Sequence, residues 1–274
     1  MALLDSHDLI AIGVRADEVR RRIHGARTTF VRVFDVHVDA APSAAPAGLA
    51  AGEIRLIGRP ASLDAAVAAA RSVAGFAKGV PVTGFALDDL RALAAAAHKP
   101  LADVCRALRA AGLEAIADVA IDTLGDFRVV EEARAAGLAV SRLTVGELAA
   151  DARIDMVERA RDLQAAVGGF KVFAPLPRTF SVAQPSTGFD DVKQVALARL
   201  LVSNIDSIQV DWPLYGPKLA QVALTVGADD VDGVAAVETG TLGTRRSAIE
   251  EIRGNIRAAA LEPIERNARF ERLA

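Results

Sequence analysis

Cysteine is almost absent from this sequence of 274 residues, in which Cys105 is the only one. A single cysteine excludes a disulfide within the chain. It also excludes an iron–sulfur cluster held by three or four cysteines of the chain. Cys105 lies in an amphipathic helical pattern from Leu101 to Leu108, where a small buried hydrophobic residue is the simplest interpretation. The sequence therefore offers no chemistry that needs clustered thiols.

Long apolar runs, one-sided charge and aromatic residues are scarce as well. No window of about 18 uncharged apolar residues occurs, so no transmembrane segment is predicted. Residues 1–8 carry acids where a signal peptide needs positive charge, and we therefore expect a cytoplasmic protein. The net charge is −3 with both signs interspersed, and aromatics make up only 4%. A basic stripe interleaved with aromatics is missing, which argues against a nucleic-acid binder.

Three common functional motifs are missing or incomplete. No Gly-x-Gly-x-x-Gly follows the first expected strand, which weakens the alternative of a Rossmann-type open sheet. No Gly-x-Ser-x-Gly elbow joins a strand to a helix, so Ser/His/Asp catalysis has no support. The strand face Asp35-x-His37-x-Asp39 could clasp a divalent ion. The other three histidines fall in the N-terminal segment or on expected helices, so no metal site is predicted.

The chain does contain a regular alternation of strand-like and helical runs. Hydrophobic residues make up 52% of it, mostly Ala, Val and Leu, which suits close packing of helices on a sheet. The eight expected strands are residues 28–39, 53–58, 80–85, 115–121, 139–145, 170–175, 207–212 and 231–237. Each except the first is followed by a helix, and this alternation predicts parallel pairing with right-handed crossovers. We therefore predict a (β/α)8 TIM-type barrel formed by the whole chain as one domain.

The first β/α unit of this barrel is expected to be shortened. Residues 40–52 are a linker of small residues with two prolines, too short for a full crossover helix. Residues 1–27 should then contain an N-terminal helix, residues 28–246 the barrel, and residues 247–274 a C-terminal helix and tail.

Function in such barrels lies at the mouth, where the C-terminal ends of the strands meet. The sequence places there His37, Asp39, Arg59, Phe85, Asp118, Asp122, Arg142, Pro175, Gln209, Asp211, Trp212 and Glu238. Buried polar groups are costly without ligand, solvent or internal pairing. Two interpretations stay open: a ligand site, or an internal network in which Arg59 and Arg142 pair with acids of the first and fourth strands.

Several segments resemble the futalosine-pathway radical enzymes of menaquinone biosynthesis, which are aminofutalosine synthase and its cyclising relative. The deazaflavin-cofactor synthases are more distant kin. The clearest resemblance lies in residues 200–233, where the form Gly227-Ala228-Asp229-Asp230-Val231-Asp232-Gly233 leans toward aminofutalosine synthase. Further similar segments lie at residues 16–25, 29–31, 53–58, 108–113, 153–164, 168–170, 173–176 and 263–267. The resemblance implies a barrel that carries S-adenosylmethionine radical chemistry.

The sequence departs from that family where the family binds its cofactors. The resemblance implies a Cys-x3-Cys-x2-Cys loop after the first strand, holding a [4Fe–4S] cluster with one iron open to S-adenosylmethionine. Residues 39–52 contain no cysteine. The family's glycine-rich run with a glutamate corresponds to residues 117–122, where Asp122 is the candidate for the glutamate's position, and its Tyr-Gly-His pattern to residues 143–146. We therefore expect no cofactor, and no radical chemistry unless another chain supplies a cluster.

Three functional hypotheses follow from this combination. The first is a homologue of aminofutalosine synthase without a cluster. It would be an accessory or heteromeric partner of an iron–sulfur-containing homologue or another menaquinone-pathway protein, or it would bind a pathway intermediate. Another hypothesis is an interaction scaffold that binds no ligand. For a ligand, the expected binding residues are His37, Arg59, Arg142, Gln209, Trp212 and Glu238.

The remaining hypothesis is a barrel enzyme with non-radical chemistry on a related nucleoside or aromatic carboxylic acid. Its acid–base candidates are Asp39, Asp118 and Asp122, because a positioned carboxyl can transfer protons. Arg59 or Arg142 would clamp the substrate carboxylate through charge-assisted hydrogen bonds.

Overall fold

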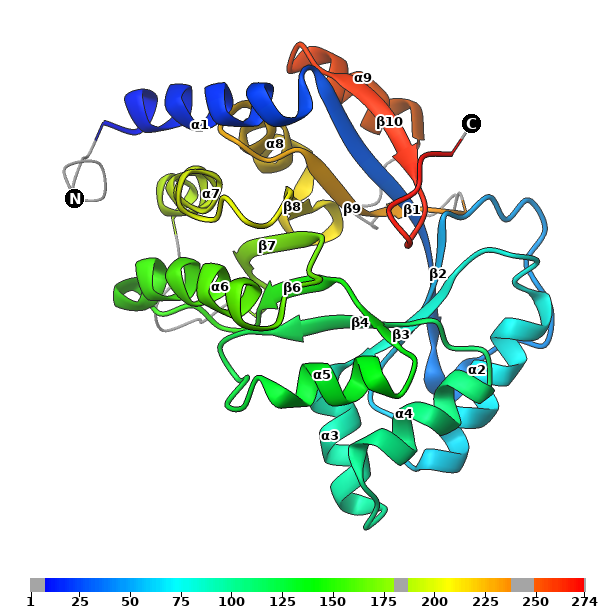
Figure 1. Cartoon of the computed structure of the whole chain (residues 1–274). Helices are drawn as coiled ribbons and strands as arrows, with labels where there is room; N and C mark the ends of the chain where they lie inside the picture. Colours follow the sequence, from blue (N-terminus) through cyan, green and yellow to red (C-terminus); the bar gives the residue numbers. More distant parts are fainter. Residues whose placement is uncertain (1–7, 180–186, 238–248, 274) are drawn as a thin grey trace.

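A computed structural model of the chain describes residues 8–179, 187–237 and 249–273 (Figure 1). Eight strands run parallel to one another around a barrel, which closes because β1 pairs with both β2 and β9. They are β1 Arg27–His37, β2 Glu53–Ile57, β3 Val82–Ala86, β4 Ala115–Ala120, β6 Arg142–Val145, β7 Val172–Pro177, β8 Ser207–Asp211 and β9 Asp230–Ala235. The predicted (β/α)8 TIM-type barrel is confirmed.

Helices surround this barrel (Figure 1). They are α1 Leu9–His24, α2 Leu63–Phe76, α3 Leu87–Ala96, α4 Leu101–Ala110, α5 Arg128–Ala135, α6 Arg153–Val167, α7 Gly188–Leu201, α8 Trp212–Thr225 and α9 Ile249–Ala258, with two 3-10 turns, η1 Val38–Ala40 and η2 Ala150–Ala152. Side-chain oxygens cap several helix N-termini. Ser62 is the N-cap of α2, and Thr187 is the N-cap of α7, where it forms a capping box with Asp190. Each cap satisfies an N–H group that the helix leaves without an internal partner.

The first unit is shortened as predicted, since the described chain between β1 and β2 holds only the turn η1. Leu49 and Ala41 of this linker pack against the core. Ser72 Oγ of α2 donates to the backbone oxygen of Pro42 over 2.8 Å. The linker itself therefore covers the place where other units carry a helix.

Two strands and one helix differ from the expected elements. The expected strand 139–145 is interrupted at Ser141, so that β5 (Ala139–Val140) pairs with the start of β4 and β6 with its end. The C-terminal tail contains a further strand, β10 (Glu262–Arg266), which pairs parallel with the first half of β1. Helix α8 begins directly at Trp212, which was expected to end a strand, and it kinks at Gly216.

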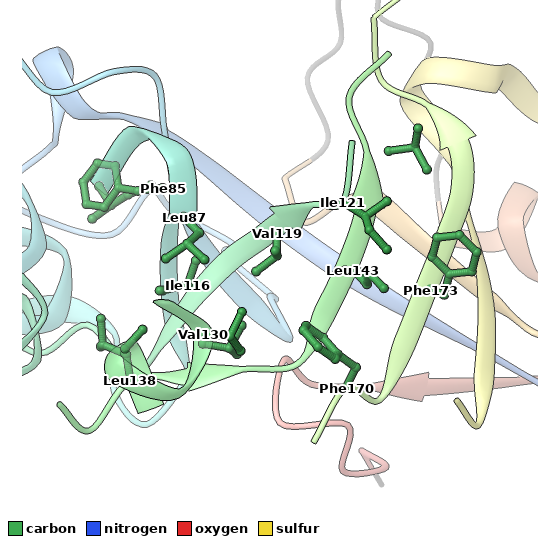
Figure 2. Close-up of a cluster of buried hydrophobic side chains, with 14 of the residues drawn as sticks. Phe85, Leu87, Ile116, Val119, Ile121, Val130, Leu138, Leu143, Phe170 and Phe173 are labelled. Carbon is green, nitrogen blue, oxygen red and sulfur yellow. The ribbon is translucent and has the colours of Figure 1, made fainter. Parts of the chain in front are cut away.

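The apolar core fills the space between the strands and the surrounding helices. Figure 2 shows one part of it, in which Val119 of β4, Leu143 of β6 and Phe173 of β7 lie with Val130 of α5. Cys105 is fully buried in α4, which agrees with the interpretation of a core residue. In the ranges that the structure describes, no helix is both long and apolar enough to cross a membrane.

Candidate functional site: a column of charge inside the barrel

Charged and polar side chains fill much of the barrel interior, where TIM barrels usually carry bulky branched aliphatic residues. The buried polar residues of its strands include Glu53, Arg55, Thr83, Arg142, Gln209, Asp211, Asp230, Asp232 and, from β10, Arg266. Buried charges are tolerated when they are paired and hydrogen-bonded. These residues form three connected groups along the barrel.

The central group is organised around Asp232 of β9. Arg55 of β2 donates to both carboxylate oxygens of Asp232, over 3.0 and 2.9 Å, and Arg142 Nη2 of β6 lies 2.6 Å from Oδ2. Arg55 Nε also donates to Glu53 over 2.7 Å, and the Thr83 hydroxyl donates to the same carboxylate over 2.6 Å. Four strands are thus tied together across the barrel interior.

These contacts decide the ionisation of the central group. Burial alone would raise the pKa of Asp232, but the charges of Arg142 and Arg55 outweigh it and lower that pKa well below its usual value. Burial works against the charge of Arg55, yet Asp232 and Glu53 raise its pKa above the ordinary one. Burial lowers the pKa of Arg142, which Asp232 partly offsets. Asp232 and Arg55 therefore stay ionised at neutral pH.

The mouth cluster, which we define as Asp118, Arg142, Arg178 and Asp211, lies above this group. Arg178 follows β7, and its Nη1 donates to Asp211 Oδ2 over 3.3 Å while its Nε lies 3.6 Å from Asp118 Oδ2. Arg142 Nη2 lies 3.7 Å from Asp211. The side chain of Arg178 is 32% exposed and that of Asp211 only 9%. Arg178 is therefore the part of the cluster that faces solvent most.

Asp211 has the most perturbed carboxyl of the mouth cluster. Burial, and then the neighbouring charge of Asp232, raise its pKa, although Arg178 and Arg142 act in the other direction. A buried carboxyl with a raised pKa at the C-terminal end of a barrel strand is a candidate functional group.

The lower group closes the other end of the barrel. Arg266 Nε and Nη2 each donate to Asp230 over 2.6 Å, and Gln209 Nε2 donates to the same carboxylate over 2.6 Å. The Thr29 hydroxyl also donates to Asp230. The ring of Phe270 lies over the Arg266 guanidinium, 4.3 Å from it. The C-terminal tail thus inserts a cation into the barrel and covers it.

The structure brings together only part of the expected mouth. Asp118, Arg142 and Asp211 come together, with Arg142 reaching up from the first position of β6. Gln209 belongs to the lower group, and Trp212 is fully buried at the start of α8. Placing Gln209 at the mouth was wrong, because it lies in the middle of strand β8. Trp212 does follow the last residue of β8, but its side chain is buried in the apolar core.

The expected polar face of β1 is also wrong in part. The strand ends at His37, so Asp39 falls in η1 rather than on the strand. Both side chains are largely exposed, with His37 Nδ1 3.8 Å from Asp39 Oδ2. Arg59 is exposed and contacts Asp89 of α3 over 3.0 Å. It does not pair with acids of the first or fourth strand, as one interpretation expected.

Asp122 has a local structural contact. Its two carboxylate oxygens accept the backbone N–H groups of Gly146 and Glu147, over 2.6 and 3.0 Å, and so hold the loop after β6. Glu238 lies outside the described residues. The roles that the sequence predicted for these residues in catalysis and ligand binding stay predictions.

Sequence reasoning missed the residues that organise the interior, namely Arg55, Asp232 and Arg178. The first two carried a usable signal. Glu53-x-Arg55 and Asp230-x-Asp232 place charges at alternate positions of apolar strands, and alternate positions share one face. Arg178 follows its strand directly and carried no such pattern.

Comparison with known proteins agrees with the resemblance in the sequence. Residues 174–274 match the family model of the CofH/MqnC C-terminal region. The chain is 35% identical over 140 residues to aminodeoxyfutalosine synthase of Streptomyces coelicolor, covering 43% of this chain and 36% of that protein. Over these residues the chain is homologous to aminodeoxyfutalosine synthase.

Two more relatives show how far this homology extends. Aminodeoxyfutalosine synthase of Thermus thermophilus is 29% identical over 187 residues, covering 58% of this chain and 50% of that protein. A 5-amino-6-(D-ribitylamino)uracil–L-tyrosine 4-hydroxyphenyl transferase of Methanosarcina acetivorans is 28% identical over 211 residues, covering 64% and 56%. The matched part thus spans about half the length of these relatives, or less.

Solved structures agree on the fold. Methylornithine synthase (PylB) superposes with a TM-score of 0.64 at 13% identity, covering 96% of this chain and 92% of that one. HydG, a maturase of the [FeFe]-hydrogenase, has a TM-score of 0.63 at 12% identity, covering 96% and 70%. At such identities the likeness extends to the barrel architecture alone.

The residues of this chain do not fit the [4Fe–4S] cluster that the family resemblance implies. The segment after β1 carries no thiol. The thiol of Cys105 is buried in α4, and burial together with the charge of Glu132 raises its pKa to about 11. It is therefore protonated at neutral pH, whereas the thiolate is the form that binds metal. Across residues 8–179, 187–237 and 249–273, no group of three or more His, Cys, Asp or Glu is placed to hold a metal ion.

Proposed function

We propose that this chain is a non-radical homologue of aminodeoxyfutalosine synthase. In menaquinone biosynthesis it works beside a second homologue that contains an iron–sulfur cluster, and it binds an intermediate of the pathway. The observation that carries the proposal is the linker between β1 and β2. It has no cysteine and packs Leu49 and Ala41 on the core. The barrel around it and the CofH/MqnC C-terminal region are retained.

The chemistry supports this division of roles. Reductive cleavage of S-adenosylmethionine needs an electron from a cluster, and cluster binding needs several thiolates. With one protonated cysteine in a helix, this chain has no set of ligands for that purpose. Radical chemistry would then depend on a second protein.

The mouth cluster supports the binding of a small molecule. Arg178 is partly exposed, and its ion pairs with Asp211 and Asp118 are long, at 3.3 and 3.6 Å. Long, partly solvated ion pairs contribute little to stability. A ligand with a negatively charged or hydrogen-bonding group could therefore engage Arg178 at a small cost to the fold.

Two measurements on the same preparation test the proposal. Co-expression with an iron–sulfur homologue, followed by affinity purification and mass determination, should yield a complex of the two chains. A thermal-shift series with futalosine-type nucleosides and chorismate-derived acids should raise the melting temperature, because a ligand of the native state stabilises it. We expect no shift with S-adenosylmethionine. Arg178→Ala should weaken the ligand response, whereas Arg59→Ala, an exposed arginine outside the mouth cluster, should not.

An indifferent monomer with no response to any of these ligands would contradict the proposal. Cleavage of S-adenosylmethionine by the isolated chain after iron–sulfur reconstitution would contradict its non-radical part.

A second candidate function is a barrel enzyme with acid–base chemistry on a related nucleoside or aromatic acid. The observation in its favour is Asp211, whose pKa is raised by burial and by Asp232 and which contacts Arg178 at the mouth. A raised carboxyl pKa suits a general acid. This function predicts turnover by the isolated chain that Asp211→Asn abolishes, and the accessory function predicts none.

A further inference from the structure

A small polar cavity of about 30 Å³ lies inside the barrel between the central and lower groups of charge. Its lining includes Arg55, Arg142 and Asp232 of the central group, and Gln209 and Arg266 of the lower group. Phe270 of the C-terminal tail also lines it. The proposed function does not use this cavity.

Nearly all hydrogen-bonding groups around the cavity already have partners. The three guanidinium nitrogens of Arg55 donate to Glu53 and Asp232. Those of Arg266 donate to Asp230 and to the backbone oxygen of Asn267. Each of these nitrogens therefore already has an acceptor.

Three buried atoms of the lining lack a hydrogen-bond partner among the described residues: Arg142 Nε, Arg142 Nη2 and Gln209 Oε1. Arg142 Nη2 already forms an ion pair with Asp232 Oδ2 at 2.6 Å, which leaves Arg142 Nε and Gln209 Oε1. Gln209 is 1% exposed and Arg142 is 7% exposed. The amide orientation of Gln209 is fixed, because only its NH₂ group can donate to the Asp230 carboxylate. The cavity thus presents one N–H donor and one carbonyl acceptor. Buried polar groups without a partner are costly, and they are usually satisfied by ordered water.

The charges around the cavity exclude an ion. An anion beside Arg142 would face the carboxylates of Glu53 and Asp232, and a cation would face Arg55, Arg142 and Arg266. A neutral molecule that both accepts and donates matches the two open groups. The volume exceeds the roughly 10–15 Å³ that one water molecule requires.

We infer that this cavity binds an ordered water molecule, which accepts a hydrogen bond from Arg142 Nε and donates one to Gln209 Oε1. The water joins the central group to the lower group. Together with the ion pairs of Arg142 and Arg178 at the mouth, it completes a column of hydrogen bonds and ion pairs through the barrel, from Arg178 to Arg266.

A high-resolution crystal structure of the whole chain, with a second crystal soaked in bromide, tests the inference. We expect one peak at about 2.7–3.2 Å from both Arg142 Nε and Gln209 Oε1, with no anomalous signal from bromide. An empty cavity, or bromide in that position, would overturn it.

A variant pair adds a second test. Gln209→Met removes the acceptor with a side chain of similar length, and the peak should disappear. Gln194→Met is the matched control, because Gln194 is also 1% exposed with an Oε1 atom that lacks a hydrogen-bond partner among the described residues, but it does not line this cavity. The peak should persist in that control. If the peak persisted in Gln209→Met, Gln209 would not be the acceptor. If this variant does not fold, the wild-type crystals alone decide whether the cavity holds a water molecule.

Discussion

Asp232 connects more of the barrel than any other single side chain of the central group. It accepts hydrogen bonds from Arg55 and forms an ion pair with Arg142, which come from strands on different sides of the barrel, and it is 1% exposed. Two cations lower its pKa in spite of complete burial. Removing one member of a buried ionic group leaves the others as uncompensated charges, and that is the costly case.

Asp232→Asn should lower the free energy of unfolding by about 3–5 kcal/mol, because Arg55 and Arg142 lose their shared counter-charge. Urea unfolding followed by circular dichroism measures the change. Asp126→Asn is the control, since Asp126 pairs with Arg128 on the surface, and it should leave the midpoint unchanged. Equal midpoints for Asp232→Asn and wild type would show that the buried network adds nothing to stability.

Asp211 should make stability depend on pH in the opposite sense from an ordinary ion-paired carboxylate. Its pKa in the folded protein is raised, by burial and then by Asp232, so the folded state binds the proton more tightly than the unfolded state. Stability from this group is greatest in acid and falls as pH rises from about 3.9, the usual unfolded value, through the raised folded value. Asp211→Asn cannot ionise.

The difference in unfolding free energy, variant minus wild type, should therefore increase with pH across that window. The amide oxygen can still accept from Leu214 N, as the carboxylate does over 3.1 Å, so the cap of α8 is kept. Chemical unfolding at a series of pH values measures the difference. A difference that does not change with pH would show that the carboxyl has an ordinary pKa.

At the residue scale, the sequence could predict that certain charged residues need a partner, but not which residues those partners are. It indicated that Arg142 needs an acid, and it could not show that the acids are Asp211 and Asp232, on strands far along the chain. It placed Arg59 correctly after β2, yet the side chain lies outward against α3. Which way a side chain points at the end of a strand depends on tertiary packing rather than on local pattern.

At the scale of elements, the eight barrel strands could be predicted because each is an apolar run and all but the first are followed by a helical pattern. The strand β10 could not, since Glu262–Arg266 is mostly polar and becomes a strand only by pairing with β1. The start of α8 was missed for another reason. The sequence continued the strand to residue 212, but Pro213 suits the first turn of a helix, and Asp211 caps that helix.

Gly216 should resist substitution because α8 needs its conformation. Its φ of 73° lies in the left-handed region, although an added Cβ would meet no atom within 4 Å. Gly216→Ala should therefore cost about 1 kcal/mol through backbone strain alone. Gly75→Ala in α2, where an added Cβ also meets nothing, should stabilise by about 0.5–1 kcal/mol because alanine favours the helix.

Thermal unfolding of the two glycine variants side by side measures this difference. Opposite shifts of the melting temperature are expected. A stabilising effect at both positions would mean that the kink at Gly216 is not required by the fold.

At the scale of the whole molecule, the resemblance to aminodeoxyfutalosine synthase and the barrel could be predicted from the sequence, but the column of charge could not. The resemblance depends on runs of neighbouring residues, which one sequence displays directly. The column depends on pairs such as Arg55 with Asp232, 177 positions apart. Closing the barrel creates such pairs, and a single sequence does not show which residues it brings together.

The C-terminal tail completes the barrel from below, and Arg266 is its critical residue. Arg266→Met keeps the aliphatic stem and removes the cation, so Asp230 loses two of its hydrogen bonds and becomes an uncompensated buried charge. We expect a loss of about 3–5 kcal/mol in unfolding free energy. We also expect faster hydrogen exchange in β10 and in the first half of β1, which pair with each other. Arg269→Met, which removes a half-exposed pair with Glu114, should cost less than about 1 kcal/mol. If both variants behaved alike, the tail would be held by its surface contacts rather than by the charge that it inserts.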